Sequence, residues 1–420
     1  MHQLDLEFFS IGSPLQSSLL KAAISLPVVD SHTHFLREGE YRFADVPDAF
    51  MLLSQYVKHD LISAGMSAME LQQLFSSRFT PEEKLELFKK YEWRISQTAY
   101  YRSFCITLRR FFGEDRLTAD NVRRVSNKVS SFMSQTQYEG FFRKNLNYSF
   151  CMNEYIYEPN FSSAFYPRVL RIPNYIGSYD TLMSSYEQEH SISNLKELDD
   201  EICRRVESGL CRGIVGLKTF AVPEGDASRD EAERTLRLLL GDHGLSIPEY
   251  DNPLSRYISR RTVELAHESG LVTAVHTGYW DDFRQLHPAH MLPLIDAYPD
   301  VRFDLYHLGY PYVRESILLA KTRPNVCLNL CWTYLISQRM AREAISEILE
   351  TVPLNKVIAF GSDTVVAPEA FGHLVMCLES LSWALADRIS AGLLTEDSAA
   401  EIAGRWLSGN AIEWYGLKPM

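Results

Sequence analysis

Two histidines separated by one residue follow an apolar run near the start of the chain. The stretch is VVDSHTHF, residues 28–35, and it places His32 and His34 two positions apart. Residues two apart on an extended chain point to the same side. Neutral imidazoles that converge in this way bind zinc and similar divalent ions. The spacing therefore predicts a metal-binding pair.

Four more ionisable side chains lie at or near the ends of later apolar runs: Lys218 in GIVGLKTF, His276 in LVTAVHTG, His307 in VRFDLYHLG and Asp363 in KVIAFGSD. A single buried histidine is more often a backbone hydrogen-bond donor than a ligand. Because four histidines and one aspartate recur at run ends, a shared metal site is the favoured interpretation. Other histidines are interpreted as ordinary surface or packing residues: His190, His243, His267 and His373.

A metal site of this kind supports hydrolysis. A bound divalent ion lowers the pKa of its water from about 15.7 toward about 7, which makes hydroxide available at neutral pH. An aspartate beside that water accepts the proton and returns it to the leaving group. Amides, lactones and esters are the expected electrophiles.

The elements that must position these residues alternate between short apolar runs and amphipathic helical stretches. Five runs between residues 213 and 363 are typical of strands buried on both faces of a parallel sheet. The helical stretch before Leu271 ends in Gly270, which is a stop signal. LPVVDSHTH, NYSFCMN and FYPRVLRIPNY add further strands upstream. About eight strands alternating with helices favour an α/β fold, a (β/α)8 TIM barrel, in which the strand ends carry the active site.

One long segment interrupts this alternation. Residues 45–147 contain several helical signals and no convincing strand. One helix is expected to begin with Thr80 as N-cap, Pro81 in the first turn and Glu83 three residues after the cap. The segment is interpreted as a helical insertion after the first strand. The chain is thus expected to be a single barrel domain over residues 1–420.

The motifs together resemble the amidohydrolase superfamily, in its amidohydrolase-related, metal-dependent branch of TIM-barrel hydrolases. The similarity runs through VVDSHTHF, GIVGLKTF, VHTGYWDDFRQLHP, DLYHLGYPYVRE, PNVCLNLCWT and FGSDTVVAPEAFG. The resemblance implies that His32, His34 and Asp363 bind the more buried metal, with His276 in single-metal members. In two-metal members, His276 and His307 hold the second ion. The resemblance also implies that Asp363 takes the proton from the metal-bound water, and His307 is expected to polarise the scissile carbonyl where it is not itself a ligand. The implied cofactor is one or two divalent ions, with zinc favoured.

The chemical state of Lys218 distinguishes a two-metal site from a one-metal site. In two-metal relatives a carboxylated lysine on the fourth strand bridges the ions, and Lys218 occupies a matching position. A bare ammonium beside two cations would be repelled, so a bridging Lys218 must be carboxylated. In the alternative, Lys218 is unmodified, one metal is bound, and the ammonium contacts a substrate anion or a neighbouring acid. The sequence leaves both open.

Loops after the strands are expected to recognise the substrate. Aromatic walls and one arginine suit a small organic molecule with a carboxylate. The candidates are Trp280, Arg284, Tyr312 and Trp332. Alternatively, the aromatic side chains only pack the loops, and Arg284 pairs with Asp281 or Asp282.

Three classes of function are compatible with these residues. A metal-dependent hydrolase is favoured. Relatives that decarboxylate unsaturated acids or isomerise sugar acids use the same kind of His-x-His centre, and they form the alternative. A non-catalytic binding protein is disfavoured because no expected ligand is missing from the chain.

Composition restricts the partners and the compartment. The chain has 42 Lys and Arg against 54 Asp and Glu, a net charge of −12, which argues against binding to nucleic acid or anionic membranes. No apolar run approaches the ~20 residues of a membrane span, and the first residues lack the basic character of a signal peptide. Seven cysteines without a Cys-x-x-Cys pair indicate free thiols. A cytoplasmic enzyme for small molecules is expected, with a homo-oligomer as one option.

Overall fold

The computed structural model describes residues 4–36, 40, 47–157, 161, 163–186, 191–223, 225 and 228–418. The first two positions of the predicted insertion, 45 and 46, lie outside this set, as does His190. The chain divides into two compact units. Unit 1 comprises residues 1–149, 332–346 and 360–404, and unit 2 comprises residues 150–331, 347–359 and 405–420. The single domain expected from the sequence stays a prediction.

Eight strands follow one another in chain order within one sheet. They are β1 (Val28–Thr33), β2 (Tyr148–Tyr155), β3 (Arg168–Arg171), β4 (Ile214–Phe220), β5 (Val272–His276), β6 (Phe303–Tyr306), β7 (Val326–Asn329) and β8 (Val357–Ile358). All the pairs from β2 and β3 through β7 and β8 are parallel. Within unit 1, Val28 donates to the Asn147 carbonyl just before β2, and Ser31 donates to the Phe360 carbonyl just after β8. The strands form a nearly closed barrel, which confirms the predicted (β/α)8 fold.

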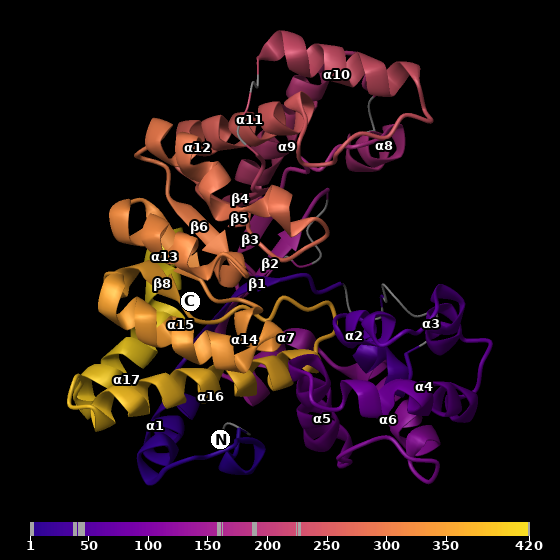
Figure 1. The fold of residues 1–420 in the computed structure, drawn as a ribbon, viewed down its shortest axis with the longest axis vertical. Coiled ribbons are helices and arrows are strands. Elements are labelled where there is room, and N and C mark those ends of the chain that lie inside the picture. Colours follow the sequence, from indigo (N-terminus) through magenta and orange to yellow (C-terminus); the bar gives the residue numbers. More distant parts are fainter. Residues whose placement is uncertain are drawn as a thin grey trace. The chain divides into compact units, whose positions relative to one another are not determined.

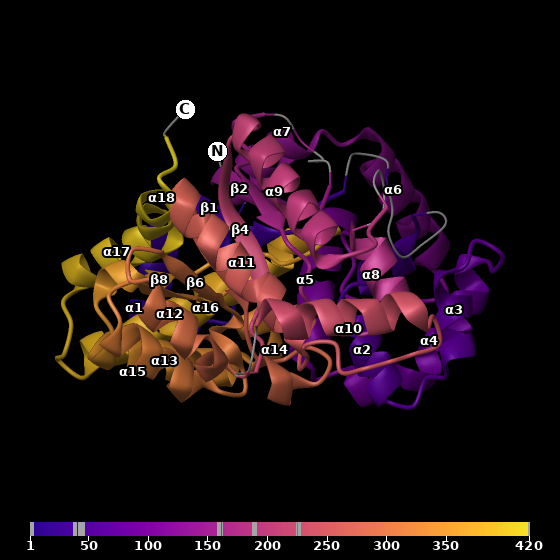
Figure 2. The ribbon, with the colours of Figure 1, turned by 90° about the horizontal axis from the view of Figure 1, so that it is seen from above.

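The strands are buried although several carry polar side chains, such as Asp304 in β6 and Asn329 in β7. Every residue of β5, β6 and β7 is buried, as expected for parallel strands covered by helices. In unit 2, helix α11 (Pro253–Ser269) packs on β4 and β5 (Figures 1 and 2). It begins at Asn252 as N-cap and ends at Gly270, whose φ of +66° confirms the predicted stop signal.

The segment after β1 is helical, as predicted. It contains η2 (Ala49–Leu53), α2 (Val57–Ser63), α3 (Ala68–Phe75), α4 (Pro81–Ile95), α5 (Ala99–Phe112), α6 (Val122–Gln135) and α7 (Tyr138–Leu146). Thr80 and Glu83 form the predicted capping box at the start of α4. Helix α5 is separate from α4 and begins after its own N-cap Thr98, and α6 ends at its C-cap Thr136, before α7. Figure 1 draws α2 to α6 as one helical group.

The remaining helices mostly follow the strands. They are α1 (Pro14–Ile24), α8 (Tyr179–Tyr186), α9 (Leu195–Cys211), α10 (Arg229–Gly241), α12 (Leu292–Ala297), α13 (Val313–Thr322), α14 (Thr333–Ile336), α15 (Gln338–Thr351), α16 (Glu369–Ser390), α17 (Glu396–Gly404) and α18 (Asn410–Tyr415). Short 3-10 turns are η1 (Leu6–Phe8), η3 (Phe283–Leu286), η4 (Pro288–Met291), η5 (His307–Gly309) and η6 (Leu354–Lys356), and η7 (Arg405–Gly409) is a π turn. Helix α16 is buried along most of its 22 residues, so it is the core helix of unit 1.

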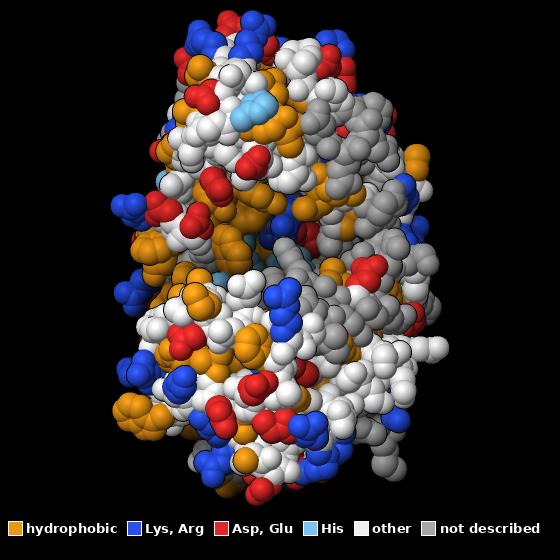
Figure 3. All heavy atoms as spheres, turned by 90° about the vertical axis from the view of Figure 1, so that its right-hand side faces the viewer, with side chains coloured by type: hydrophobic (Ala, Val, Ile, Leu, Met, Phe, Trp, Pro, Cys, Tyr) orange, Lys and Arg blue, Asp and Glu red, His pale blue; other side chains and the backbone are white. Residues whose placement is uncertain are grey.

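Surface and thiol properties agree with the composition. On the face drawn in Figure 3, acidic and basic side chains are interspersed rather than gathered by sign. All seven cysteines are free thiols. None of the described helices combines the length and the hydropathy that a bilayer-crossing segment needs.

Candidate metal centre

Unit 1 brings together three of the predicted ligands. The Nε2 atoms of His32 and His34 lie 3.3 and 3.1 Å from Oδ1 of Asp363. Ligands about 2.0–2.1 Å from a tetrahedral ion lie about 3.3 Å from one another. His32 and Asp363 are buried, with 3% and 6% of their surfaces exposed. The donor types and spacings therefore fit a small divalent cation.

Backbone pairing between β1 and the segment after β8 sets this geometry. The Phe360 carbonyl accepts from Ser31, the Thr364 carbonyl accepts from the His34 N–H, and the Asp363 N–H donates to the His32 carbonyl at 2.8 Å. Asp363 adopts a φ of +49°, a conformation that few side chains other than Asn and Asp tolerate well. The His-x-His pair and the aspartate are thus fixed by adjacent backbone segments, although they are more than 300 positions apart.

Asp30 lies directly beneath this pairing and was not identified from the sequence. Its side chain is fully buried, and Oδ1 accepts from the Ser362 N–H at 2.8 Å and from the His32 N–H at 3.4 Å. Burial raises the pKa of Asp30 to about 7, against the lowering effect of its hydrogen bonds with Ser362. Asp30 ties the backbones of the two ligand-bearing segments together. Its position two residues before His32 was the available signal.

Tyr56 is a second residue that the sequence did not reveal. Its hydroxyl donates to the backbone carbonyl of Asp363. The ring stacks between those of Tyr100 and Trp332, with centroids 5.2 and 5.1 Å away. Tyr56 comes from the helical insertion, immediately before α2. The insertion thus contacts the backbone of the predicted base.

Unit 2 pairs the other two predicted histidines. Nε2 of His307 lies 3.0 Å from Nδ1 of His276, and Nδ1 of His307 lies 3.2 Å from the Cys331 carbonyl. A carbonyl only accepts, so Nδ1 of His307 carries the proton and Nε2 carries the lone pair. That lone pair can accept the Nδ1–H of His276, which leaves Nε2 of His276 as a ligand atom. His307 is therefore set to orient His276.

Lys218 lies in a charged cluster of unit 2. Its ammonium is 3.7 Å from Oε2 of Glu154 and 4.0 Å from the ring centre of Tyr306. Arg171 pairs with the other oxygen of Glu154. Lys218, Glu154 and Arg171 come from β4, β2 and β3, and Lys218 is 1% exposed. A carboxylate and an aromatic face both stabilise a positively charged ammonium.

Fully buried side chains continue this cluster below Lys218. Asp304 accepts from the Tyr415 hydroxyl at 2.7 Å and from the Asn329 amide at 3.0 Å. Burial raises the pKa of Asp304 to about 6, while Tyr415, Asn329 and the nearby Lys218 lower it. Tyr415 belongs to α18, so this helix supplies a hydrogen-bond donor to the buried carboxylate of Asp304.

The four predicted substrate contacts differ in their surroundings. Arg284 binds Asp282 through two hydrogen bonds of 2.8 and 2.9 Å, and its side chain is 78% exposed, so it has the partner that the sequence offered as an alternative. Trp280 is partly exposed, and its ring lies 6.2 Å from that of His276. The ring of Tyr312 lies 4.1 Å from that of His287, tilted by 52°. The role of these residues and of the buried Trp332 in substrate binding stays a prediction.

His373 and His243 were both interpreted from the sequence as ordinary surface or packing residues. His373 is 3% exposed and donates from Nδ1 to the Ser362 carbonyl at 2.6 Å, so it is a buried histidine bonded to the backbone. This carbonyl directly precedes Asp363. His243, in contrast, stacks on Tyr179 at 3.6 Å, as a packing residue does.

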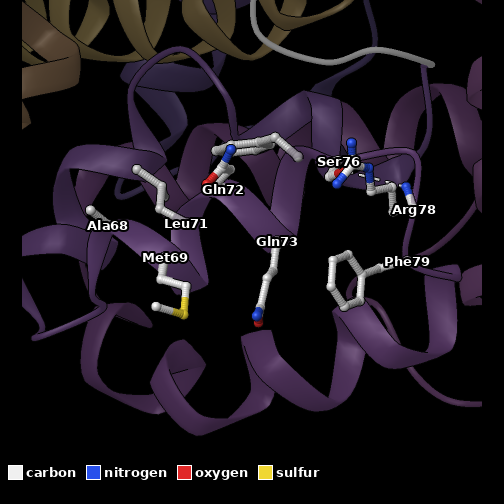
Figure 4. A pocket seen from close by; sticks show the side chains of 9 residues that line it. Ala68, Met69, Leu71, Gln72, Gln73, Ser76, Arg78 and Phe79 are labelled. Atoms are coloured by element: carbon white, nitrogen blue, oxygen red, sulfur yellow. Dashed lines mark hydrogen bonds between the residues drawn. The ribbon is translucent and has the colours of Figure 1, made fainter.

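A separate hollow of about 570 Å³ lies in the helical insertion. Figure 4 shows Met69, Gln73 and Phe79 among the side chains around it. Its lining residues fall between positions 68 and 79 and include no histidine or acidic side chain. The hollow therefore offers no group for metal binding or acid–base catalysis.

Both the sequence and the fold of this chain are similar to those of known proteins. A family model described as Amidohydrolase matches residues 196–417. Protein fluG of Emericella nidulans is 28% identical over 253 residues, which are 58% of this chain, and the chain spans about 29% of the length of that protein.

Two solved structures are similar over nearly the whole chain. The uronate isomerase of Thermotoga maritima has a TM-score of 0.77 and 13% identity, with 99% of this chain and 100% of that chain covered. The glucuronate isomerase of Caulobacter crescentus also has a TM-score of 0.77, with 16% identity and 99% and 97% coverage. At these identities the similarity establishes the fold. The family model covers more than half of the residues of this chain, and the chain therefore belongs to the amidohydrolase family.

Proposed function

We propose that this chain is a metal-dependent hydrolase that acts on a small substrate bearing a carboxylate. The observation that carries the proposal is the position of Asp363, whose Oδ1 lies 3.1 and 3.3 Å from two imidazole nitrogens. A carboxylate in this position can bind a cation through one oxygen and accept a proton through the other. Membership of the amidohydrolase family supports hydrolysis as the reaction.

We propose that one divalent ion, with zinc favoured, is held in unit 1 by His32, His34 and Asp363. The distances of 3.3 and 3.1 Å between the imidazole nitrogens and the Asp363 carboxylate support this set, because ligands of one tetrahedral ion lie about this far apart. The ammonium of Lys218 already has Glu154 as a partner at 3.7 Å. This contact favours an unmodified lysine over a carboxylated bridge, and hence one metal over two.

When bound, the ion would polarise the substrate carbonyl and lower the pKa of the attacking water. Asp363 accepts the proton of that water and delivers it to the leaving group. The backbone bonds of Asp363 to His32 and Tyr56 hold the carboxylate in place during both transfers. His307 fixes the ring of His276, because its Nε2 lies 3.0 Å from Nδ1 of His276.

We assign recognition of the substrate carboxylate to Arg171 and Lys218 rather than to Arg284. Arg171 and Lys218 place two cations beside the buried carboxylate of Glu154. Both cations lie 5.8 Å from the ring centre of Phe220, and that ring stacks on His276 at 4.8 Å. The Phe220 ring thus separates the two cations from His276.

Isomerisation of a sugar acid is the second candidate. It is favoured by the fold similarity to uronate and glucuronate isomerases over 99% of the chain, which includes the helical insertion. In that reaction Asp363 would carry a proton between neighbouring carbon atoms. Arg171 and Lys218 would bind the carboxylate of the sugar acid.

One experiment separates the two candidates. Protein loaded with zinc is incubated in H₂¹⁸O with amides, lactones and esters of small dicarboxylic acids, and with hexuronates. Hydrolysis places one ¹⁸O in the product, whereas isomerisation converts a hexuronate into an isomer of equal mass. Arg171→Gln should raise KM for substrates with a carboxylate and leave a neutral analogue nearly unaffected. A zinc-loaded protein that turns over no member of the panel would contradict both candidates.

A further inference from the structure

Two side chains of α16 contact the residues on either side of Asp363. His373 donates to the carbonyl of Ser362 at 2.6 Å, and Glu369 accepts from the Thr364 hydroxyl at 2.8 Å. His373 and Glu369 are four residues apart, so they lie on the same face of the helix. One helix therefore contacts both peptide neighbours of the proposed base.

The His373 contact has a fixed direction. A carbonyl oxygen only accepts, so Nδ1 of His373 must carry the proton. Burial lowers the pKa of His373 to about 4, against the opposing effects of Ser362 and Asp363, and the ring is therefore neutral at physiological pH. The imidazole acts as a permanent donor to the residue before Asp363.

The Glu369 contact orders the residue after Asp363. The Thr364 hydroxyl donates to Glu369 and accepts from the Val366 N–H at 3.1 Å. The hydroxyl is thus satisfied on both sides, and Glu369 is only 6% exposed. Thr364 cannot turn without breaking two buried hydrogen bonds, each of which contributes about 1 kcal/mol.

The helical insertion braces α16 between these two residues. A Cβ atom on Gly372 would lie 2.5 Å from the Ser103 carbonyl oxygen and 2.8 Å from Oγ1 of Thr107. Ser103 and Thr107 belong to α5, and the two helices pack along one another in unit 1. The backbones meet at the turn of α16 that carries Glu369 and His373.

We propose that Glu369 and His373 are positioning residues that hold Asp363 in its ligand conformation, with α5 of the insertion as their support. Asp363 needs such support because a φ of +49° costs about 1–2 kcal/mol relative to ordinary backbone conformations. The inference rests on the proposed function only in taking Asp363 as a metal ligand. It assigns the insertion a role in shaping the metal centre.

The test measures zinc affinity, so it needs no substrate. His373→Leu removes the donor, whereas His373→Asn places an amide N–H near the position of Nδ1. Ser380→Ala is the control, because this α16 hydroxyl donates only to the Met376 carbonyl one turn earlier in the same helix. Zinc dissociation constants come from competition with a chromophoric chelator, and thermal unfolding of the metal-free proteins verifies that each variant folds.

We expect His373→Leu to weaken zinc binding by about 10–100-fold, the usual effect of removing a group that orients a ligand. His373→Asn should bind zinc close to the wild-type affinity, and so should Ser380→Ala. If His373→Leu does not fold, Thr364→Val and Thr364→Ser replace it, since only serine keeps the hydroxyl; valine should weaken binding and serine should not.

Two outcomes would overturn the inference in distinguishable ways. A folded His373→Leu, or Thr364→Val, that binds zinc as tightly as Ser380→Ala would show that the contacts do not position Asp363, while the proposed function would stand. A wild-type protein that binds no zinc, manganese or cobalt would refute the proposed metal enzyme, and the positioning role with it.

Discussion

The coupling free energy between Lys218 and Glu154 reports whether the Lys218 side chain is positively charged. The two side chains are 1% and 2% exposed and their charged atoms are 3.7 Å apart. At an effective dielectric constant of 20, opposite unit charges at this distance attract by about 4 kcal/mol. Arg171 also binds Glu154 and takes part of this attraction. We therefore expect a coupling free energy of about 1–3 kcal/mol between Lys218 and Glu154.

A double-mutant cycle measures this coupling. The variants are Lys218→Met, Glu154→Gln and the double variant, and the quantity is the free energy of unfolding from urea titration of metal-free protein. Glu154→Gln alone should destabilise by about 3–5 kcal/mol, because it leaves buried cations without their carboxylate. The double variant should be more stable than the sum of the single effects predicts.

A carboxylated Lys218 would give the opposite result. Its side chain would be an anion beside the Glu154 carboxylate, so the coupling between positions 218 and 154 would change sign, although Glu154→Gln would still break the ion pair with Arg171. The cycle is therefore repeated on protein prepared with excess zinc and bicarbonate. A coupling free energy that changes sign under these conditions, together with two zinc ions per chain, would refute the one-metal site.

Three further perturbations test other parts of the structure. Asp363→Asn should lower turnover by at least ~10²-fold while most of the metal stays bound, because it removes the general base and leaves both histidine ligands; equal rates in the two proteins would mean that another group is the base. Gly278→Ala should lower the melting temperature, because its φ is +81° and a Cβ would lie 2.2 Å from the Tyr310 carbonyl oxygen; an unchanged melting temperature would contradict this close approach of the loops after β5 and β6. Burial raises the pKa of Glu369 to about 8 from 4.5, although Thr364 and the nearby charge of Lys58 lower it. The folded state thus holds this proton more tightly, and the stability that it contributes is complete below pH 4.5 and is lost as the pH rises toward 8. Compared with wild type, Glu369→Gln should therefore gain stability between pH 5 and pH 8 in urea titrations, by up to a few kcal/mol (~1.4 per unit of pKa difference); a constant difference across this range would show that Glu369 is ionised when folded.

The strands and the residues at their ends could be predicted from the sequence alone. A parallel strand buried on both faces needs an uninterrupted apolar run, and this local requirement marks β1 and β4 to β8 in the chain. His32, His276 and Asp363 stand out because each is a polar residue where such a run ends. The capping box of Thr80 and Glu83 is equally local, since all its hydrogen bonds join residues three positions apart.

Only the tertiary structure decided which side chains support these residues. Asp30 and Ser362 are 332 positions apart, and Tyr56 and Asp363 are 307 apart. No local pattern records such partners, because the contact exists only after the sheet has formed and the insertion has packed. Glu154 directly follows the predicted run NYSFCMN and is the penultimate residue of β2, so its place at a run end was the available signal, while its pairing with Arg171 and Lys218 was not. The apolar periodicity of the chain thus determined the barrel and the candidate ligands, while long-range packing decided the charge environment of Lys218 and the groups that hold Asp363.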